Sequence, residues 1–258
     1  MSIVENKYPI LEYSTEHKAI IEPSPSDPPF PKVCVMCFFA QPILKIVEAF
    51  GGVCIRTYPS EVRSYEMWKI TFHGHELGLI QAAVGAASCA AIAHWLFAKG
   101  VETLLCCGSC GVLENIPAGH VILPIRALRD EGVSYQYLPP DRWIELEADI
   151  LYVLYSTLVK YNIPYVSAST WTTDGFYRET AEMVAYRRAE GCQVVEMECA
   201  ALASVARFYG RRFGQLLYSG DILVDPQQYD DRGWFNNYTA RETLLYITLE
   251  AAIKLIQA

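Results

Sequence analysis

The sequence predicts an α/β protein, a three-layer α/β/α sandwich built around a mixed, largely parallel central sheet. Short apolar runs typical of strands alternate with amphipathic segments typical of helices from residue 32 to the C-terminus. No repeat, charge run or linker interrupts this alternation. Hydrophobic residues make up 52% of the chain and charged residues 19%, which is enough to build a large buried core. We therefore expect an irregular N-terminal arm at residues 1–31 and a single domain at residues 32–258.

The arm is predicted from its prolines. Residues 22–31 read EPSPSDPPFP. Proline lacks an N–H donor and fixes φ, so this stretch cannot form a helix or a central strand. We expect it to lead into the domain as a loop that lies against the body.

In the first half of the domain, glycines mark where the predicted helices and strands begin and end. Gly51 and Gly52 end one helical pattern, and the His73-Gly74-His75 segment joins two strand patterns as a hairpin. Gly85 begins a helix rich in small residues. The expected elements are a strand at 32–38, a helix at 42–50, strands at 53–57, 67–72 and 76–82, and a helix at 86–99.

The second half continues the same alternation. The expected strands are 103–107, 121–129, 165–170, 193–195 and 213–218, and the expected helices are 143–161, 179–189, one from Glu198 onward and 241–257. The first of these strands runs into Gly108-Ser109-Cys110-Gly111. We interpret that segment as a tight turn whose backbone N–H groups and hydroxyl can also be presented to an anion.

The most informative stretch is GCQVVEMECAALASVARFYG at residues 191–210. Its hydrophobic pattern changes from strand-like to helical at Glu198. Glu196 and Glu198 flank Met197 at this junction, and both flanking segments are apolar. The two carboxylates are therefore not expected on a freely solvated surface. In α/β sheets such junctions are where ligands bind.

Three other strand ends carry polar or aromatic residues, at 108–111, 171–178 and 219–221. Together with residues 196–198 they indicate one shared pocket along one edge of the sheet.

The charge balance restricts the partners. The net charge is −8 and the pI is about 5.2, so we expect neither nucleic acid nor an anionic membrane as a partner. No apolar run reaches the roughly 18 residues of a membrane span. The first residues lack the pattern of a secretory signal. An odd number of cysteines, nine, favours a reduced protein of the cytoplasm.

Two CxxC pairs are weighed as a metal site. Cys34 and Cys37 belong to a predicted strand, so their sulfurs should point to opposite faces. A zinc site would need them to converge with Cys107 and Cys110, and we therefore expect no metal.

The order of four motifs resembles the nucleoside phosphorylase family of the hexameric type, from about Val33 to the C-terminus. The motifs are GSCG, the Thr-Thr-Asp-x-Phe-Tyr loop, VEMECAAL and Ser-Gly-Asp. The family includes purine nucleoside phosphorylase, uridine phosphorylase and methylthioadenosine nucleosidase. The resemblance implies a mixed sheet flanked by helices and homo-oligomers built from dimers, with inorganic phosphate as a co-substrate and no other cofactor.

The resemblance also implies the roles of the nucleoside-binding residues. Met197 and Glu198 would contact the ribose, and Glu198 would accept hydrogen bonds from its hydroxyls. Phe176 would stack on the base, while Val195 and Glu196 would line the base pocket. Glycosidic cleavage builds positive charge on the sugar, which a buried carboxylate such as Glu198 tolerates.

The remaining implied roles concern the proton and the phosphate. Asp221 would protonate the leaving purine, since burial can keep a carboxyl group neutral. Gly108 and Ser109 would form part of a phosphate cradle. Arg63 is similar in position to an arginine that the family lends to phosphate across a dimer interface. The family's catalytic arginine would be Arg232 or Arg241.

The residues after Tyr177 narrow the choice of base. Uridine phosphorylases carry a Gln-x-Arg pair there, and this chain does not. Together with Asp221, this favours a purine base. The segment RDEGVSYQY is similar to one in uridine phosphorylases, so uridine stays an alternative.

The chain departs from the family at two phosphate-binding arginines, whose places hold Leu44 and Cys106. A charge-assisted hydrogen bond is worth roughly 1.5–3 kcal/mol, so losing two would weaken phosphate binding about 10²–10⁴-fold. This loss follows unless Lys45, Arg129 or Arg178 stands in for the missing arginines.

These residues are compatible with three functions. The first is phosphorolysis of a nucleoside to a free base and (deoxy)ribose 1-phosphate. The second is hydrolysis by water, although the family's nucleosidases use a glutamate after the first strand and Gln41 is the nearest polar residue here. The third is nucleoside binding without turnover.

Overall fold

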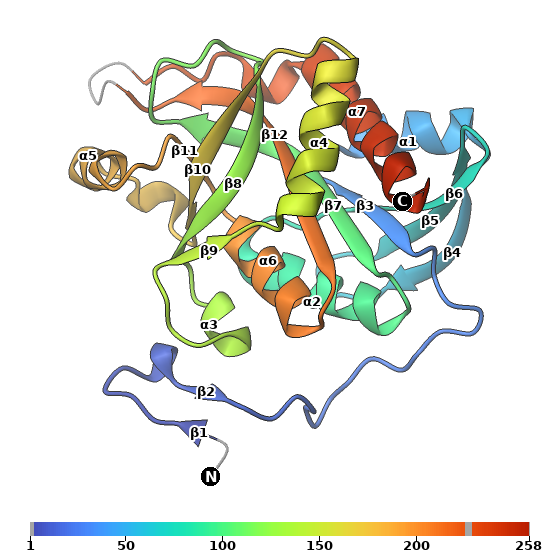
Figure 1. Cartoon of the computed structure of the whole chain (residues 1–258), viewed down its shortest axis with the longest axis horizontal. Coiled ribbons are helices and arrows are strands. Elements are labelled where there is room, and N and C mark those ends of the chain that lie inside the picture. Colours follow the sequence, from blue (N-terminus) through green and yellow to red (C-terminus); the bar gives the residue numbers. More distant parts are fainter. Residues whose placement is uncertain (1–2, 225–228, 258) are drawn as a thin grey trace.

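The computed structural model describes residues 3–224 and 229–257 and has three layers. A mixed sheet lies in the middle, with helices on both of its faces (Figure 1). One buried cluster joins the sheet to α2 (Ala86–Ala98) and α6 (Cys199–Phe208). A second cluster joins the opposite face to α1 (Ala40–Ala49), α4 (Ala148–Lys160) and α7 (Tyr238–Gln257). The predicted three-layer sandwich is confirmed.

The strands of the sheet follow an order that brings distant segments together. From one edge to the other they are β11 (Val194–Glu196), β10 (Tyr165–Thr173), β8 (Val121–Asp130), β12 (Arg212–Ile222), β7 (Thr103–Val112), β3 (Val33–Cys37), β6 (His75–Gln81), β5 (Tyr65–Phe72) and β4 (Val53–Tyr58). The β10–β8, β12–β7, β7–β3 and β3–β6 pairs are parallel, and the β4–β5–β6 edge is antiparallel. The β8–β12 pair in the middle of the sheet is antiparallel, so the sheet is mixed and largely parallel.

Strand β11 distorts the sheet where the site forms. It pairs in parallel with β10 and also antiparallel with β7, where Val195 lies opposite Gly111. This double pairing brings the end of β7 beside the β11–α6 junction. Glu196 and Ser109 are thereby placed at the same edge of the sheet.

Strand β3 shows why the CxxC spacing makes no metal site. All of its residues are buried. Cys34 belongs to the core cluster on one face of the sheet and Cys37 to the cluster on the other, as the period of two predicts. Their sulfurs do not converge.

The predicted helix at 143–161 was wrong at its start. Trp143–Glu145 form strand β9, which pairs antiparallel with β8, and the helix begins only at Ala148. The guanidinium of Arg126 lies 4.1 Å from the centre of the Trp143 ring. This pairing and stacking override the helical pattern, which continued without a break through the strand.

The predicted tight turn at Gly108-Ser109-Cys110-Gly111 was also wrong, because this segment is part of β7. The Ser-Gly-Asp segment ending at Asp221, where a strand was expected to end, lies within β12. A Cβ at Gly108 would come within 2.7 Å of the Phe38 ring, and one at Gly111 within 2.6 Å of Leu223. These glycines permit close packing within a strand rather than a reversal of the chain.

Helix α5 (Ala181–Ala189) begins two residues later than expected. The Thr180 side chain caps it by accepting a hydrogen bond from the Met183 N–H at 3.3 Å. Glu179 therefore lies outside the helix, directly after the 3₁₀ turn η2 (Phe176–Arg178). The smaller elements are α3 (Ser134–Tyr137) and η3 (Trp234–Asn236).

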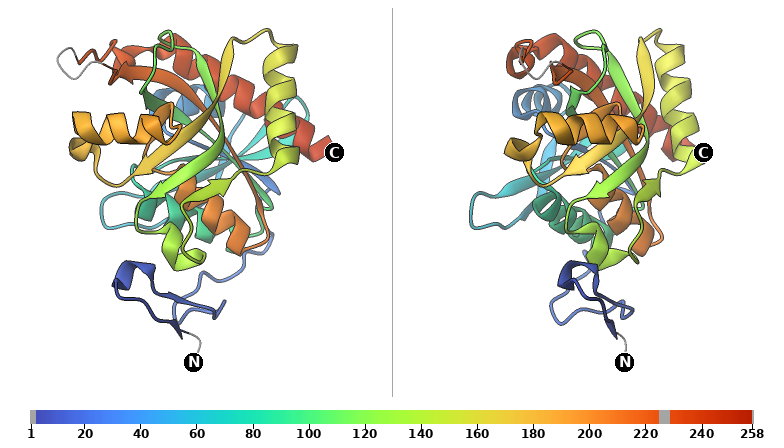
Figure 2. Two further views of the ribbon diagram at one scale, coloured as in Figure 1. Left: turned by 60° about the vertical axis from the view of Figure 1, so that its left-hand side comes forward. Right: turned by 90° about the vertical axis from the view of Figure 1, so that its left-hand side faces the viewer.

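The N-terminal arm extends away from the sandwich (Figure 2). It contains the 3₁₀ turn η1 (Pro9–Leu11) and a small hairpin of β1 (Ile3–Val4) and β2 (Tyr13–Ser14), which the expectation of an irregular arm did not include. Phe30 anchors its last part, because it is buried and packs edge-on against Trp95.

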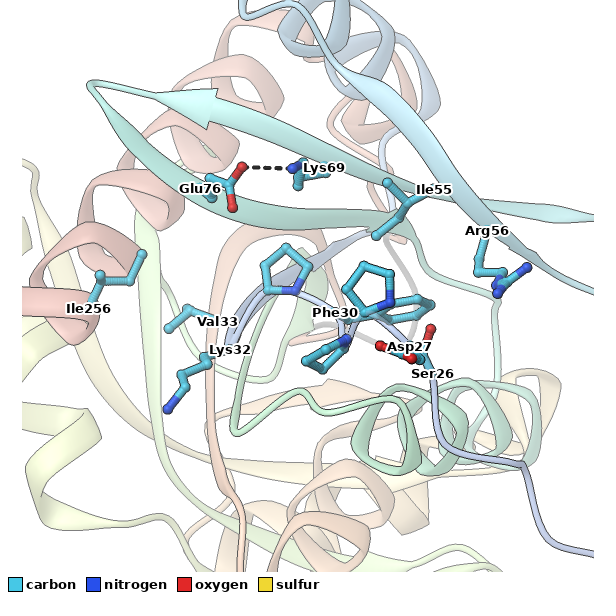
Figure 3. A pocket seen from close by; sticks show the side chains of 13 residues that line it. Ser26, Asp27, Phe30, Lys32, Val33, Ile55, Arg56, Lys69, Glu76 and Ile256 are labelled. Carbon is cyan, nitrogen blue, oxygen red and sulfur yellow. Dashed lines mark hydrogen bonds and ion pairs between the residues drawn. The ribbon is translucent and has the colours of Figure 1, made fainter.

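A hollow of about 580 Å³ lies beside this anchored segment (Figure 3). We call it the arm hollow; Ser26–Val33, Ile55, Arg56, Lys69, Glu76 and Ile256 line it. Among the described residues, no helix is both long and apolar enough to cross a membrane.

Candidate active site

A cavity of about 520 Å³ lies where β7, β11 and β12 end, and we call it the strand-end cavity. Eight of the residues to which the sequence analysis gives a role line it: Ser109, Phe176, Val195, Glu196, Met197, Glu198, Asp221 and Arg241. Its other lining residues are Phe38, Phe39, Val84, Cys110, Gly111, Glu179, Trp234 and Phe235. Segments far apart along the chain thus meet around one space.

Glu196 is held rigidly at the junction of β11 and α6. One carboxylate oxygen accepts hydrogen bonds from the hydroxyls of Thr170 at 3.2 Å and Thr172 at 2.6 Å. The other accepts from the backbone N–H groups of Glu198 at 2.7 Å and Cys199 at 2.6 Å, at the start of α6. A carboxylate at a helix N-terminus is stabilised by the orphan N–H groups there. Glu196 therefore fixes the backbone that carries Glu198.

Glu198 is buried and faces the strand-end cavity. Its Oε1 accepts a hydrogen bond from the backbone N–H of Gly85 at 2.6 Å. Burial, and next the negative charge of Glu196, raise the pKa of Glu198 to about 8. Gly85 has φ +95°, a conformation that side chains rarely adopt, so glycine is required where the chain enters α2.

A second carboxylate pair, Asp221 and Glu179, lines the cavity from β12 and from the segment before α5. The Tyr229 hydroxyl donates to Asp221 Oδ2 at 3.2 Å. Burial raises the pKa of Asp221. Burial, and next the charge of Asp221, raise the pKa of Glu179 to about 8. The cavity therefore holds acidic groups that retain protons near neutral pH.

Arg241 is the arginine that lines this cavity in the described part of the chain. Its Nε donates to the Tyr218 hydroxyl at 3.2 Å and an Nη donates to the Trp234 carbonyl at 3.3 Å. Its guanidinium also lies 5.1 Å from the Phe235 ring centre and 5.2 Å from that of Phe39. Tyr218 pairs with Ser109 in the register of β12 and β7, so the cation and the Ser109 hydroxyl belong to one part of the cavity.

The structure separates the two candidates for the catalytic arginine. Arg232 does not line the strand-end cavity; its guanidinium donates to the Ile116 carbonyl at 2.8 Å. Arg241, in the first turn of α7, does line it. The sequence could not decide between the two arginines, because both follow Asp221 in the long segment that leads from β12 into α7.

None of the three cations expected to replace the missing phosphate arginines reaches the cavity within one chain. Lys45 pairs with Glu242 on the surface. Arg129 is buried and donates to the Ser134 hydroxyl at 3.0 Å and the Pro139 carbonyl at 2.8 Å. Arg178 is exposed on η2. A replacement by one of these residues therefore has no support in the lining of the cavity of the single chain.

The two residues that replace the family's arginines, and two of the residues implied in phosphate binding, also lie outside the cavity. Leu44 is 53% exposed on α1, and Cys106 is fully buried in the core. Gly108 lies beneath the Phe38 ring and is not a lining residue. Arg63, on the loop between β4 and β5, is exposed and lies 4.0 Å from Glu66. Its suggested role across a dimer interface stays a prediction.

The sequence analysis did not identify four aromatic residues that line the cavity, nor the glycine whose N–H group holds Glu198. Phe38 and Phe39 follow the first buried strand directly, which is a position where a ligand contact could have been expected. Trp234 and Phe235 lie in a segment with no periodic pattern, so no signal distinguished them. Gly85 was recognised only as a helix start.

The arrangement suits a polar ligand with a flat ring. Phe176 and Phe38 offer aromatic surface, Glu198 and Asp221 offer carboxyl groups, and Arg241 offers positive charge. No cluster of metal-ligating side chains was found among the described residues.

A family model and a related protein sequence both match most of this chain, and both are phosphorylases. A model of the phosphorylase superfamily matches residues 32–252. The purine nucleoside phosphorylase DeoD-type of Dichelobacter nodosus (strain VCS1703A) is 29% identical over 224 residues, which are 84% of this chain and 88% of that protein.

Two solved structures share the fold. The crystal structure of purine nucleoside phosphorylase from Toxoplasma gondii in complex with immucillin-H has a TM-score of 0.75 at 18% identity, covering 92% of this chain and 98% of that chain. The crystal structure of AMP nucleosidase from Bacteroides thetaiotaomicron VPI-5482 has a TM-score of 0.69 at 22% identity, covering 88% and 89%.

Proposed function

The chain belongs to the phosphorylase superfamily, and we propose that it cleaves the N-glycosidic bond of a purine nucleoside by phosphorolysis. The products are the free base and (deoxy)ribose 1-phosphate. The observation that carries the proposal is that Glu198 and Asp221, which lie far apart in the sequence, line one cavity together with Phe176 and Ser109. The relatives support the coarser statement of an enzyme acting on nucleosides.

Glu198 serves the sugar in this proposal. As the C–N bond lengthens, the ribose gains positive charge, and this charge favours the ionised form of Glu198, which carries a proton near neutral pH in the empty site. The resulting carboxylate, held in a buried position, stabilises the charge on the sugar more strongly than it could in bulk solvent. The Gly85 N–H holds one of its oxygens in place. Glu196 helps to fix the position of Glu198, since it accepts hydrogen bonds from the backbone N–H groups at the start of α6.

Asp221 serves the leaving base. A carboxyl group must carry a proton at neutral pH if it is to donate one to the imidazole nitrogen of a purine. Burial raises the pKa of Asp221 in the direction that this role requires. The nearby Tyr229 hydroxyl orients the carboxyl group through its hydrogen bond.

Phosphate is proposed to bind beside Ser109 and Arg241. Arg241 gives the one positive charge that the described residues of a single chain contribute to the cavity lining, and Ser109 gives a hydroxyl donor. We propose that a homo-oligomer adds Arg63 of a neighbouring copy. In the single chain this arginine is exposed, and its contacts with Ser64, Tyr65 and Glu66 are all local.

Hydrolysis is the second candidate, and a specific observation favours it. The cavity lining combines Glu179, Glu196, Glu198 and Asp221 with Arg241, a balance that opposes a phosphate dianion. Water is neutral, so hydrolysis does not need a group of positively charged side chains in the cavity. No glutamate stands directly after β3 to act as the base, and Glu179 is another acidic residue of the cavity that could take this role.

The test is to incubate the purified protein with purine nucleosides and uridine, in the presence and absence of phosphate, and to measure base release. Phosphate-dependent release with formation of a sugar 1-phosphate supports the proposal. Release of the base without phosphate would overturn phosphorolysis and support hydrolysis by a nucleosidase. Binding without release would leave a nucleoside-binding protein.

A further inference from the structure

Glu179 is a cavity residue to which the family pattern gives no role. It lies three positions after Phe176, and the 3₁₀ turn η2 spans Phe176–Arg178. The turn is closed by the Arg178 N–H, which donates to the Gly175 carbonyl at 2.6 Å. Because a 3₁₀ turn repeats every three residues, positions 176 and 179 lie on one side. Both side chains accordingly line the strand-end cavity.

Among residues 3–224 and 229–257, none donates a hydrogen bond to the carboxyl group of Glu179 and none forms an ion pair with it. Glu190, by contrast, lies at the other end of α5 and is paired with both Arg142 and Arg187. The half-buried carboxyl group of Glu179 lines the cavity and keeps its acceptor positions open there. It is therefore available to a ligand that brings N–H or O–H groups.

Asp221 shares this end of the cavity. Its negative charge is close enough to act on Glu179, and burial together with that charge raises the pKa of Glu179 to about 8. Tyr229 occupies one oxygen of Asp221. Even when one of the two carboxyl groups carries a proton, the pair offers more acceptor than donor positions. The complementary ligand edge is therefore rich in N–H donors.

We propose that Glu179 is a specificity-determining residue that accepts a hydrogen bond from the exocyclic amino group of the base, so that the site prefers aminopurine nucleosides. The inference rests on the proposed function. If Phe176 stacks on the face of the ring and Asp221 meets its imidazole nitrogen, Glu179 meets the edge of the same ring. Adenosine and guanosine each carry an exocyclic amino group. Inosine has neither amino group; it shares the C6 carbonyl oxygen of guanosine but lacks the C2 amino donor, and it lacks the C6 amino donor of adenosine.

The experiment compares kcat/KM for adenosine, guanosine and inosine in the wild-type protein, in Glu179→Gln and in Glu182→Gln. Glu182 is exposed in the first turn of α5, outside the cavity, and provides the matched control. The amide of Glu179→Gln replaces one acceptor with a donor. We expect the preference for the better aminopurine over inosine to fall at least about 10-fold in Glu179→Gln and to stay unchanged in Glu182→Gln.

The two aminopurines distinguish which amino group is recognised, at C6 for adenosine or at C2 for guanosine. An unchanged preference in Glu179→Gln, with cleavage intact, would overturn the inference and leave the proposed function standing. If the wild-type protein cleaves none of the three, the proposed function fails. The dissociation constants of the same nucleosides for the same variants then test Glu179, and an equal affinity for all three would overturn its role.

Discussion

The arm hollow and the strand-end cavity are nearly equal in volume, at about 580 and 520 Å³, yet their charges are arranged in opposite ways. In the arm hollow, Lys69 and Glu76 lie 2.7 Å apart as an exposed pair (Figure 3). In the strand-end cavity, acidic groups lie together and the pKa values of Glu179 and Glu198 are raised to about 8. The two hollows therefore differ in whether their acidic groups are paired with cations, and not in volume, and we take this difference to mark the proposed active site.

The physical basis of the difference is desolvation. An exposed ion pair contributes about 0–1 kcal/mol and needs no ligand to explain it. A buried carboxyl group next to another is destabilising, and such groups persist where a site requires them. Substitutions in the two hollows should therefore differ widely in their effects on activity and stability.

Asp221→Asn should show the largest loss of activity. An amide cannot deliver the proton to the leaving base, so we expect kcat/KM for purine nucleosides to fall about 10²–10⁴-fold. Steady-state kinetics measure this loss. If a nucleoside whose leaving group needs no proton were impaired as much as adenosine, Asp221 would not be acting as an acid.

Glu198→Gln should come second, with kcat/KM reduced on the order of 10²-fold, because the neutral amide stabilises the cationic sugar poorly. Thermal unfolding should not shift downward, since the substitution removes a buried group that repels Glu196. Glu76→Gln in the arm hollow is the matched control and should keep full activity. An inactive Glu76 variant would contradict the contrast between the two hollows.

Glu196→Ala should chiefly affect stability. It leaves the hydroxyls of Thr170 and Thr172 and the N–H groups of Glu198 and Cys199 without their acceptor. We expect a loss of about 3 kcal/mol in the free energy of unfolding, measured by urea denaturation. Glu196→Gln keeps the shape and should lose less. Equal losses in the two variants would show that these hydrogen bonds are not what holds the junction.

The pH dependence of stability should differ between the hollows. Glu198 has a pKa of about 8 in the folded chain and an ordinary value when unfolded, so folding retains a proton that the unfolded chain releases. Stability from this group is fully present below about pH 4.5 and is lost as the pH rises toward 8, at up to about 1.4 kcal/mol per pH unit. Denaturation of the unliganded protein between pH 5 and 8 measures the slope. Glu198→Gln should reduce it, and an unchanged slope would contradict the raised pKa.

Lys69→Ala should have the smallest effect. It removes an exposed ion pair from the arm hollow, and we expect a change within about 0.5 kcal/mol in stability and less than about twofold in kcat/KM. A larger loss of activity would show that the arm hollow takes part in the function.

Local patterns predicted the layers and most elements, because strands and helices of this chain bury continuous apolar faces. Strand β9 was missed, since its pairing with β8 depends on residues distant in the sequence. The segment Gly108–Gly111 was misread as a turn because glycine serves close packing as well as chain reversals, and only the neighbours Phe38 and Leu223 decide between them.

The candidate site divides in the same way. Glu196, Met197 and Glu198 were evident from polar residues placed between apolar flanks. Arg241 could not be distinguished from Arg232 by spacing, because the choice depends on how a long segment returns to the sheet. Glu179 was concealed because the helical pattern was taken to begin at Glu179, whereas Thr180 caps a helix that begins at Ala181. Gly85 acts through its backbone N–H, which no residue type reveals.

The decisive measurement is a crystal structure of the protein with a purine C-nucleoside, whose carbon–carbon bond between base and sugar cannot be cleaved. We expect the ligand in the strand-end cavity, with its ring on Phe176, its sugar hydroxyls on Glu198 and its imidazole nitrogen facing Asp221. A ligand seated in the arm hollow, or one whose sugar hydroxyls lie away from Glu198, would contradict the account.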